Sequence, residues 1–286
     1  MKCARIGDVG QEIPAVMVSD NEFVDISDLT TDIDGSFLSR VDLAALADEV
    51  AARVAAGRIE PLAGRRVGSP IARPHQVLCI GLNYADHAEE SGMAIPEEPI
   101  VFNKAPNTVV GPFDDVVIPR GSVKTDWEVE LGIVIGSRVR YLSSPEEAWA
   151  HVAGFVLVND VSERAFQLER GGQWVKGKSC ETFNPVGPWL VTPDEIPDVQ
   201  GLGMWLDVNG QRMQTGSTST MIFGVPFLVW YLSQFMVLES GDLINTGTPP
   251  GVGLGMTPQR FLAAGDVMEL GIDRLGSQRQ RLVAVD

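Results

Sequence analysis

Short apolar runs separated by turn-forming residues constrain the fold of this chain more than any other feature of its sequence. They begin after about residue 70, and few of the segments between them have helical spacing. A run of a few β-branched and aliphatic residues bounded by Gly, Pro, Asn or Asp is typical of a strand. We therefore predict an α+β fold that is mostly β, with strands at Val77–Ile80, Val116–Ile118, Leu131–Ile135, Val152–Val158 and Leu243–Ile244.

A small α/β unit is predicted over residues 1–70. Two β-prone segments, Ala15–Ser19 and Phe23–Ile26, precede a stretch in which apolar residues recur at three- and four-residue steps from Leu43 to Val54. That spacing predicts a helix, which Gly57 ends. The Pro-, Gly- and Arg-rich segment that follows is typical of a connector. We place a domain boundary near residue 70, with the second domain at residues 71–286.

The charge of the chain argues against two classes of partner. Its 38 acidic and 22 basic side chains give a net charge of −16. A surface this acidic repels nucleic-acid phosphates and anionic lipid. We therefore expect a protein that acts on a small molecule, without nucleic acid or membrane as a partner.

No segment is predicted to enter a membrane. The N-terminus lacks the apolar core of a secretory signal, so we expect a cytoplasmic protein. One long stretch, from Met213 to Leu238, has no charged residue, but Gly224 and Pro226 interrupt it. It is better explained as a buried helix with Pro226 near its first turn.

Three local motifs predict two helix starts and a hairpin. Ser144 and Thr192 are each followed by Pro and, three positions later, by Glu. This is the pattern of a hydroxyl N-cap with Pro in the first helical position. Asn209 and Gly210 lie between two strand-like segments and predict a tight turn with positive φ.

Carboxylates gather in two of the apolar runs. In the run from Asp126 to Ile133, period-two alternation places Glu128 and Glu130 on the same face of a strand. Asp160 ends another apolar run. Alone, the two glutamates are as well explained by a half-exposed strand with a solvated face. Three carboxylates in apolar surroundings, however, are costly unless a cation neutralises them.

A hard divalent cation would supply that neutralisation. Carboxylate oxygens are the ligands that Mg²⁺ and Mn²⁺ prefer. Zinc is disfavoured, because the three histidines, His75, His87 and His151, have no paired ligand spacing. Three scattered cysteines likewise suggest neither a zinc site nor disulfides.

Two further segments carry candidate catalytic groups. His87 and Glu90 are three residues apart, so on a helix they would share a face, as an imidazole and its orienting carboxylate do. On spacing alone, a surface histidine near an incidental acid is the more common explanation. Lys178 lies in a Gly-Lys-Ser triplet that lacks the upstream glycines of a nucleotide loop. Near three carboxylates it could instead balance charge and bind a substrate carboxylate or enolate oxygen.

Taken together, the motifs resemble those of the fumarylacetoacetate hydrolase family over roughly residues 70–285. Six ordered blocks carry the resemblance: GLNYADHAEE (81–90), FNKAPNTVVGP (102–112), DWEVELGIVIG (126–136), VNDVSERAFQ (158–167), KGKS (176–179) and INTGTPPGVG (244–253). The resemblance implies a mixed β-roll catalytic domain preceded by a small N-terminal domain. It also implies a homodimer.

The resemblance implies roles for particular residues. Glu128, Glu130 and Asp160 match the family's metal triad, which would hold Mg²⁺ or Mn²⁺. Lys178 matches its active-site lysine, and His87 and Glu90 match its catalytic dyad. The positions that commonly line the substrate pocket are matched by Lys104, Arg164, Gln167 and Thr248.

The family acts on 2-oxo acids and related diacids. The stretch from Glu169 to Glu195 is similar to the subgroup that acts on 2,4-diketo-3-deoxy sugar acids. The resemblance thus implies a C–C hydrolase that splits the C3–C4 bond of L-2,4-diketo-3-deoxyrhamnonate, or of the fuconate analogue, into pyruvate and lactate. Oxaloacetate decarboxylation and 2-oxo-diacid isomerisation or hydration are the alternatives within the family. A member without catalytic activity is a remote third.

Overall fold

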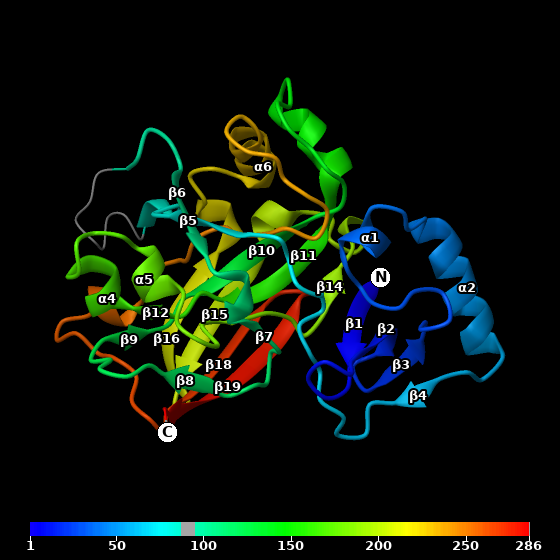
Figure 1. Cartoon of the computed structure of the whole chain (residues 1–286), viewed down its shortest axis with the longest axis horizontal. Helices are drawn as coiled ribbons and strands as arrows, with labels where there is room; N and C mark the ends of the chain where they lie inside the picture. Colours follow the sequence, from blue (N-terminus) through cyan, green and yellow to red (C-terminus); the bar gives the residue numbers. More distant parts are fainter. Residues whose placement is uncertain (87–94, 286) are drawn as a thin grey trace.

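Two β-sheets dominate the computed structural model, which describes residues 1–86 and 95–285 (Figure 1). In the larger sheet only the β17–β5 pair is parallel. Its ten strands lie in the order β4 (Glu60–Pro61), β3 (Glu22–Asp25), β2 (Ile13–Ser19), β1 (Lys2–Ile6), β14 (Leu190–Val191), β11 (Val152–Asn159), β10 (Val129–Ile135), β17 (Leu243–Asn245), β5 (Val77–Gly81) and β6 (Ile100–Lys104). The α+β, mostly β class expected from the sequence is confirmed.

The smaller sheet packs against the middle of the larger one. Its five strands lie in the order β16 (Gln211–Ser217), β15 (Gly203–Val208), β18 (Val267–Ile272), β19 (Gly276–Ala284) and β8 (Val116–Ile118). Strands β10 and β11 contact β18 across the interface between the sheets. Two short pairs complete the β-structure: β12 (Ser162–Glu163) with β9 (Thr125–Asp126), and β13 (Asn184–Pro185) with β7 (Val109–Val110).

The helices are α1 (Gly35–Leu38), α2 (Leu43–Ala55), α4 (Arg164–Leu168), α5 (Val175–Lys178) and α6 (Val225–Ser233), with 3-10 turns at Pro106–Thr108, Pro145–His151, Pro193–Glu195, Val199–Gly201, Thr218–Thr220 and Gly253–Gly255. Among the residues that the structure describes, all α-helices but α2 and α6 are a single turn or little more. Helix α6 is the buried helix predicted within the uncharged stretch, and Pro226 lies in its first turn. In the described part of the chain, no helix combines the length and the apolar character needed to cross a membrane.

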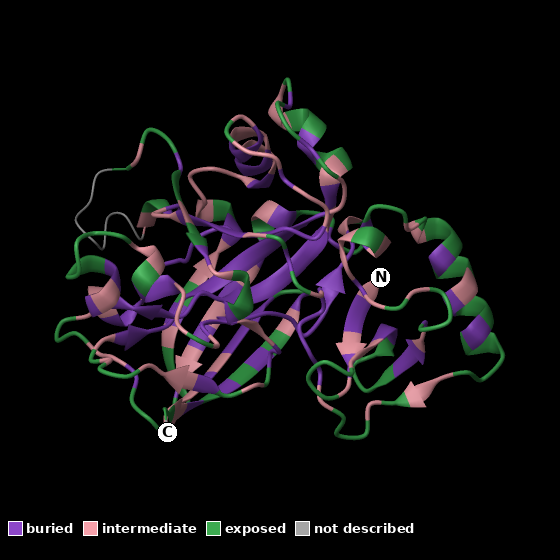
Figure 2. Cartoon of the chain, in the orientation of Figure 1, coloured by how far each residue is buried: buried purple, intermediate pink, exposed green. Residues whose placement is uncertain are grey.

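Both faces of the central strands are buried, as Figure 2 shows for β10 and β11. Leu131 and Ile133 of β10 face the core shared with the smaller sheet. Val134 faces a second core formed with α2 and the N-terminal strands. A strand covered on both faces has no polar side, so its sequence is a continuous apolar run.

The N-terminal strands continue the larger sheet rather than forming a sheet of their own. Strand β1 pairs with β14, so Lys2 lies opposite Val191. The predicted boundary near residue 70 falls between β4 and β5. The division into two domains stays a prediction, since the residues before this boundary share both cores with the rest of the chain.

The predictions for helix α2 and for the turn at Asn209 and Gly210 are confirmed. Helix α2 begins and ends where the periodicity places it, and Asn209 and Gly210 have φ of +52° and +75° in the β15–β16 turn. Ser144 and Thr192 occupy N-cap positions followed by Pro, as predicted, but they begin 3-10 turns instead of α-helices and neither hydroxyl makes a capping hydrogen bond. The Thr192 hydroxyl instead accepts a hydrogen bond from the N-terminal amine, because β1 brings Met1 beside it.

Candidate active site

Three carboxylates meet where β10 begins and β11 ends. Glu128 directly precedes β10, Glu130 lies on it, and Asp160 directly follows β11. The strands are antiparallel with Val129 opposite Asn159, so the residue after β11 lies beside the start of β10. One carboxylate oxygen from each of the three buried residues lies within 4.8 Å of the others. The period-two pattern thus brings Glu128 and Glu130 to one strand face, and the register of the two strands adds Asp160 from the neighbouring strand.

Three buried cations surround this acidic centre. Lys178 Nζ donates to Glu128 Oε2 at 2.6 Å and to Asp160 Oδ2 at 3.0 Å. Arg164 Nη2 contacts the other oxygen of Glu128 at 2.7 Å. Lys104 Nζ donates to the other oxygen of Asp160, Oδ1. Glu128 and Asp160 are therefore fully paired.

Glu130 has a different environment. Within the described residues its partner is a backbone amide, Gly247 N, at 2.8 Å. Burial, followed by the charges of Asp160 and Glu128, raises the pKa of Glu130 well above its ordinary value. Burial also opposes ionisation of Glu128, but Lys178 and Arg164 outweigh it and hold the pKa of Glu128 at about 2. A buried carboxylate without a positive partner is unfavourable unless a proton or a cation joins it.

The donor set fits a hard divalent cation. It consists of carboxylate oxygens alone, which suit Mg²⁺ or Mn²⁺. Glu130 supplies the uncompensated negative charge that such an ion would neutralise. His151 is not part of the group, because its Nδ1 pairs with Ser137 Oγ at 2.8 Å. Glu128, Glu130 and Asp160 are thus the residues that could hold the metal.

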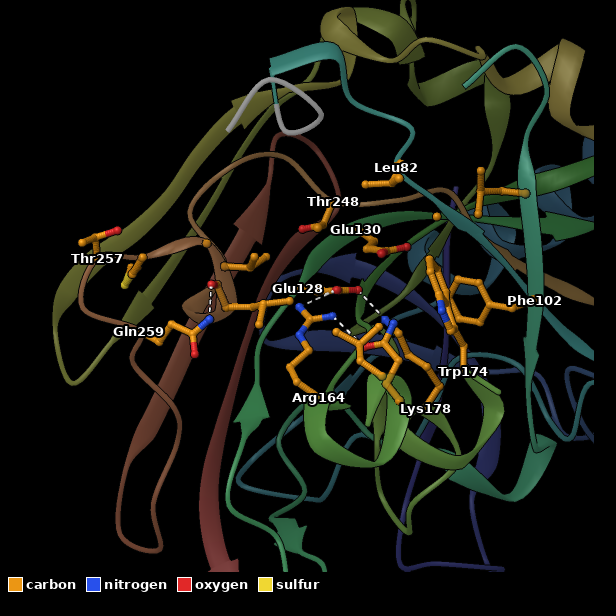
Figure 3. A pocket seen from close by; sticks show the side chains of 18 of the residues that line it. Leu82, Phe102, Glu128, Glu130, Arg164, Trp174, Lys178, Thr248, Thr257 and Gln259 are labelled. Carbon is orange, nitrogen blue, oxygen red and sulfur yellow. Dashed lines mark hydrogen bonds and ion pairs between the residues drawn. The ribbon is translucent and has the colours of Figure 1, made fainter. Parts of the chain in front are cut away.

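A cavity of about 550 Å³ opens above the acidic centre. Figure 3 shows Glu128 and Glu130 at its middle, Arg164 and Lys178 on one side, and Leu82 and Thr248 on the other. Phe102 and Trp174 stand at one end, and Thr257 and Gln259 at the opposite end. The remaining lining residues are Ile80, Gly81, Gln167, Leu168, Val252, Leu254, Gly255, Met256 and Pro258.

Of the four predicted pocket residues, three line this cavity: Arg164, Gln167 and Thr248. Arg164 Nη1 donates to Gln167 Oε1 at 3.1 Å, which fixes both side chains. The Thr248 hydroxyl donates to Val129 O at 2.9 Å and accepts from Gln214 Nε2 at 2.8 Å. The predicted dyad of His87 and Glu90 lies outside the described residues.

Lys104 was predicted to line the substrate pocket, and the structure places it beneath the cavity instead. Its amine is fully buried and donates to Asp160 and to the carbonyls of Val161 and Phe183, the latter two at 3.0 and 2.7 Å. All three of its hydrogens are used within the protein. Its position is that of a residue that holds Asp160 in place.

We expect Lys104→Met to lower the free energy of unfolding by about 3–5 kcal/mol, because it removes one of the two buried cations that pair with Asp160 and the hydrogen bonds to the carbonyls of Val161 and Phe183. Denaturant unfolding measures this. Lys124→Met is the matched control, since Lys124 pairs with Glu169 at the surface and should cost less than about 1 kcal/mol. Equal stability of the two variants would contradict the assignment of Lys104.

Asp126 is a residue that the sequence analysis missed. It is fully buried and accepts hydrogen bonds from Arg164 Nε at 2.8 Å and from the backbone amides of Gly253 and Leu254 at 2.7 and 3.0 Å. Asp126 therefore links Arg164, which contacts Glu128, to the segment after Val252, which forms part of the cavity wall. The available signal was its spacing, two positions before Glu128 on the same strand face.

Comparison with known proteins places the chain among related sequences and folds. A family model described as fumarylacetoacetate (FAA) hydrolase, C-terminal, matches residues 76–283. A protein from Burkholderia ambifaria with a provisional hydrolase name is 50% identical over 281 residues, which is 98% of each chain.

Solved structures extend the comparison. The chain aligns with 2-hydroxyhepta-2,4-diene-1,7-dioate isomerase from Mycobacterium marinum with a TM-score of 0.78 and 30% identity, over 99% of this chain and 98% of that one. It aligns with maleylpyruvate hydrolase from Sphingobium sp. SYK-6, crystallised with manganese(II) and pyruvate, with a TM-score of 0.82 and 27% identity over the whole of both chains.

Proposed function

Because the chain belongs to the fumarylacetoacetate hydrolase family, a family of hydrolases and isomerases, we propose that it is a metal-dependent hydrolase that cleaves the C3–C4 bond of a 2,4-diketo acid. The observation that carries the proposal is the buried acidic centre at the floor of a cavity beside Lys178, in which Glu130 has no cationic partner among the described residues. The manganese and pyruvate bound to the Sphingobium hydrolase agree with this reaction class.

In the proposed reaction, water adds to the C4 ketone and the C3–C4 bond then breaks. The bonding electrons pass to C3, which leaves as the enolate of pyruvate and takes up a proton, while C4 leaves as a carboxylic acid. A divalent cation held by the three carboxylates would supply Lewis-acid stabilisation of the charge that develops on the 2-oxo oxygen.

Side chains of the cavity supply the rest of the proposed chemistry. Lys178 lies at hydrogen-bonding distance from Glu128 and Asp160, so its ammonium group is held where a substrate oxyanion would form. Burial lowers the pKa of Lys178, but Asp160 and Glu128 outweigh it and raise this pKa above its ordinary value, so the amine stays charged. By family resemblance, His87 would take the proton from the attacking water and Glu90 would orient it.

His87→Ala is expected to lower kcat by about 10²–10⁴-fold, the usual contribution of a general base. Metal affinity should be unchanged, since the carboxylates are intact. Calorimetric titration with Mn²⁺ and a pyruvate-release assay separate the two effects. His75→Ala is the control, and turnover unchanged in both variants would refute water activation by His87.

The substrate that we propose is L-2,4-diketo-3-deoxyrhamnonate or its fuconate analogue, with pyruvate and lactate as products. The support is the stretch from Glu169 to Glu195, which resembles that subgroup and which contributes Trp174 and Lys178 to the cavity. We also propose a homodimer by the same resemblance, which light scattering would test.

The test is product analysis with each candidate substrate, with Mg²⁺ and with a chelator. Equal amounts of pyruvate and lactate, formed only with metal, would support the hydrolase. Pyruvate and CO₂ from oxaloacetate alone would indicate a decarboxylase. Isomerisation is the second candidate, because the Mycobacterium marinum structure is that of a dioate isomerase. It would change the ultraviolet spectrum of a diene-dioate without releasing pyruvate.

A further inference from the structure

The cavity has an unusual distribution of charge away from its acidic centre. Among the lining residues that the structure describes, the charged ones are Glu128, Glu130, Arg164 and Lys178, and all four belong to the centre itself. Every other lining side chain is either apolar or a neutral hydroxyl or amide. This holds at both ends of the cavity, at Phe102 and Trp174 as well as at Thr257 and Gln259 (Figure 3).

Both lining cations are already paired with carboxylates of the acidic centre. The guanidinium of Arg164 is shared between Asp126, Glu128 and Gln167. The ammonium of Lys178 is shared between Glu128 and Asp160. Lys176, two residues earlier, is directed to the Arg170 carbonyl and does not line the cavity.

The charge balance of the buried network leads to the same result. Four carboxylates, those of Asp126, Glu128, Glu130 and Asp160, are joined to three cations, those of Lys104, Arg164 and Lys178. The network is one negative charge in excess. A bound divalent cation would leave it one positive charge in excess, which a single substrate carboxylate neutralises.

Among the lining residues that the structure describes, a second carboxylate on the substrate would find no cation outside the acidic centre. Taking an unpaired carboxylate out of water into a partly apolar site is strongly unfavourable, and a site lacking a cation thereby rejects it. Neutral polar groups on the tail meet better partners. Thr257 and Gln259 present a hydroxyl and an amide, which hydrogen-bond to hydroxyl groups.

We propose that the cavity selects 2-oxo acids with one carboxylate and an uncharged, hydroxylated or apolar tail, and that it discriminates against dicarboxylates. The proposal rests on the proposed function, whose substrate class it narrows. On this proposal, substrate specificity is set by the uncharged side chains that line the cavity in the chain segments following Arg164 and Val252.

A matched pair of substrates tests the proposal. One is 2,4-dioxoheptanedioate, and the other is the same acid with its terminal carboxylate converted to a carboxamide of equal size. We expect kcat/KM for pyruvate release to be at least about 30-fold higher for the carboxamide, because the carboxylate has no partner.

A binding measurement, which needs no turnover, complements the kinetic comparison of the two substrates. 2-Oxoglutarate and 5-methyl-2-oxohexanoate both carry the 2-oxo acid group, lack the 4-oxo group that cleavage requires, and differ in the charge of the tail. In calorimetry with Mg²⁺ present, we expect 2-oxoglutarate to bind at least about tenfold more weakly.

A lysine added to the cavity wall should weaken the preference for an uncharged tail. Leu168 and Gln259 are exposed residues at the cavity wall, so lysine should be tolerated at either position. Leu168→Lys or Gln259→Lys should raise the relative kcat/KM for the dicarboxylate at least about tenfold. The controls Leu168→Met and Gln259→Met have similar length without charge and should leave the ratio as it is.

The outcomes separate this proposal from the proposed function. Metal-dependent pyruvate release with equal or greater kcat/KM for the dicarboxylate would overturn the specificity and leave the hydrolase intact. No pyruvate from either substrate would overturn the hydrolase, and the calorimetric comparison would still decide the specificity: equal affinity for both 2-oxo acids would refute it.

Discussion

Glu130→Gln is expected to reduce kcat/KM about a thousandfold or more and at the same time to make the metal-free protein more stable. The amide oxygen can still accept from Gly247 N, but it carries no charge with which to bind a divalent cation. Loss of Lewis-acid stabilisation is worth several kcal/mol in the transition state. Removal of an uncompensated buried carboxylate should raise the free energy of unfolding by about 1–3 kcal/mol.

The stability difference has a defined dependence on pH. Since burial and the neighbouring carboxylates raise the pKa of Glu130, the folded metal-free protein keeps this proton to higher pH than the unfolded chain does. The stabilisation that this proton gives to the folded protein is complete at pH values below the pKa of Glu130 in the unfolded chain. It is lost as the pH rises through the pKa of Glu130 in the folded protein. Glutamine does not ionise, so the advantage of Glu130→Gln should grow as the pH rises above the ordinary pKa of a glutamate.

Thermal unfolding with chelator and with Mn²⁺ measures both effects. In Mn²⁺ the order should invert, because only the native protein gains stability from the ion. Glu169→Gln, an exposed carboxylate at the end of α4, is the control and should change neither activity nor stability. If Mn²⁺ stabilised Glu130→Gln as strongly as the native protein, Glu130 would not be a ligand.

Lys178→Met should reduce kcat about 10²–10³-fold, the usual effect of removing one group that stabilises a developing oxyanion. Metal affinity should persist, because the three carboxylates stay in place. The measurement is a steady-state assay with Mn²⁺ titration of each variant.

The chain provides a matched control for this substitution. Lys176 lies on the same short helix, is exposed and bonds to a backbone carbonyl instead of a carboxylate. Lys176→Met should therefore retain the native kcat. Equal losses in the two variants would mean that α5 was disrupted and that Lys178 has no particular role in the reaction.

Much of the secondary structure could be predicted from local pattern, because it depends on burial of adjacent residues. The apolar runs gave β5, β8, β10, β11 and β17, and the helical spacing gave α2. The N-cap positions of Ser144 and Thr192 were predicted correctly, but neither hydroxyl makes the capping hydrogen bond, and the Thr192 hydroxyl accepts a hydrogen bond from the N-terminal amine instead. Sequence pattern has no access to such a contact between residues at opposite ends of the chain.

The candidate site divides in a similar way. The acids themselves were evident from residue type and alternation, and their burial together was expected. The groups that pair with those acids could not be predicted from the sequence. Lys104 resembled a substrate ligand but lies under Asp160, and Asp126 was read as a strand residue although it anchors the wall of the cavity.

The class of fold and the chemical types of the reacting groups could be predicted from hydrophobic periodicity and residue identity, and the family from the resemblance of six ordered motif blocks. The pairing of each cation with its carboxylate, and the position of the uncharged wall of the cavity, are set by the tertiary structure. Those outcomes depend on the register of β10 against β11 and on loops that return from residues 164–178 and 246–259. The electrostatics that would select one substrate over another therefore arise from distances between strands, which no local pattern encodes.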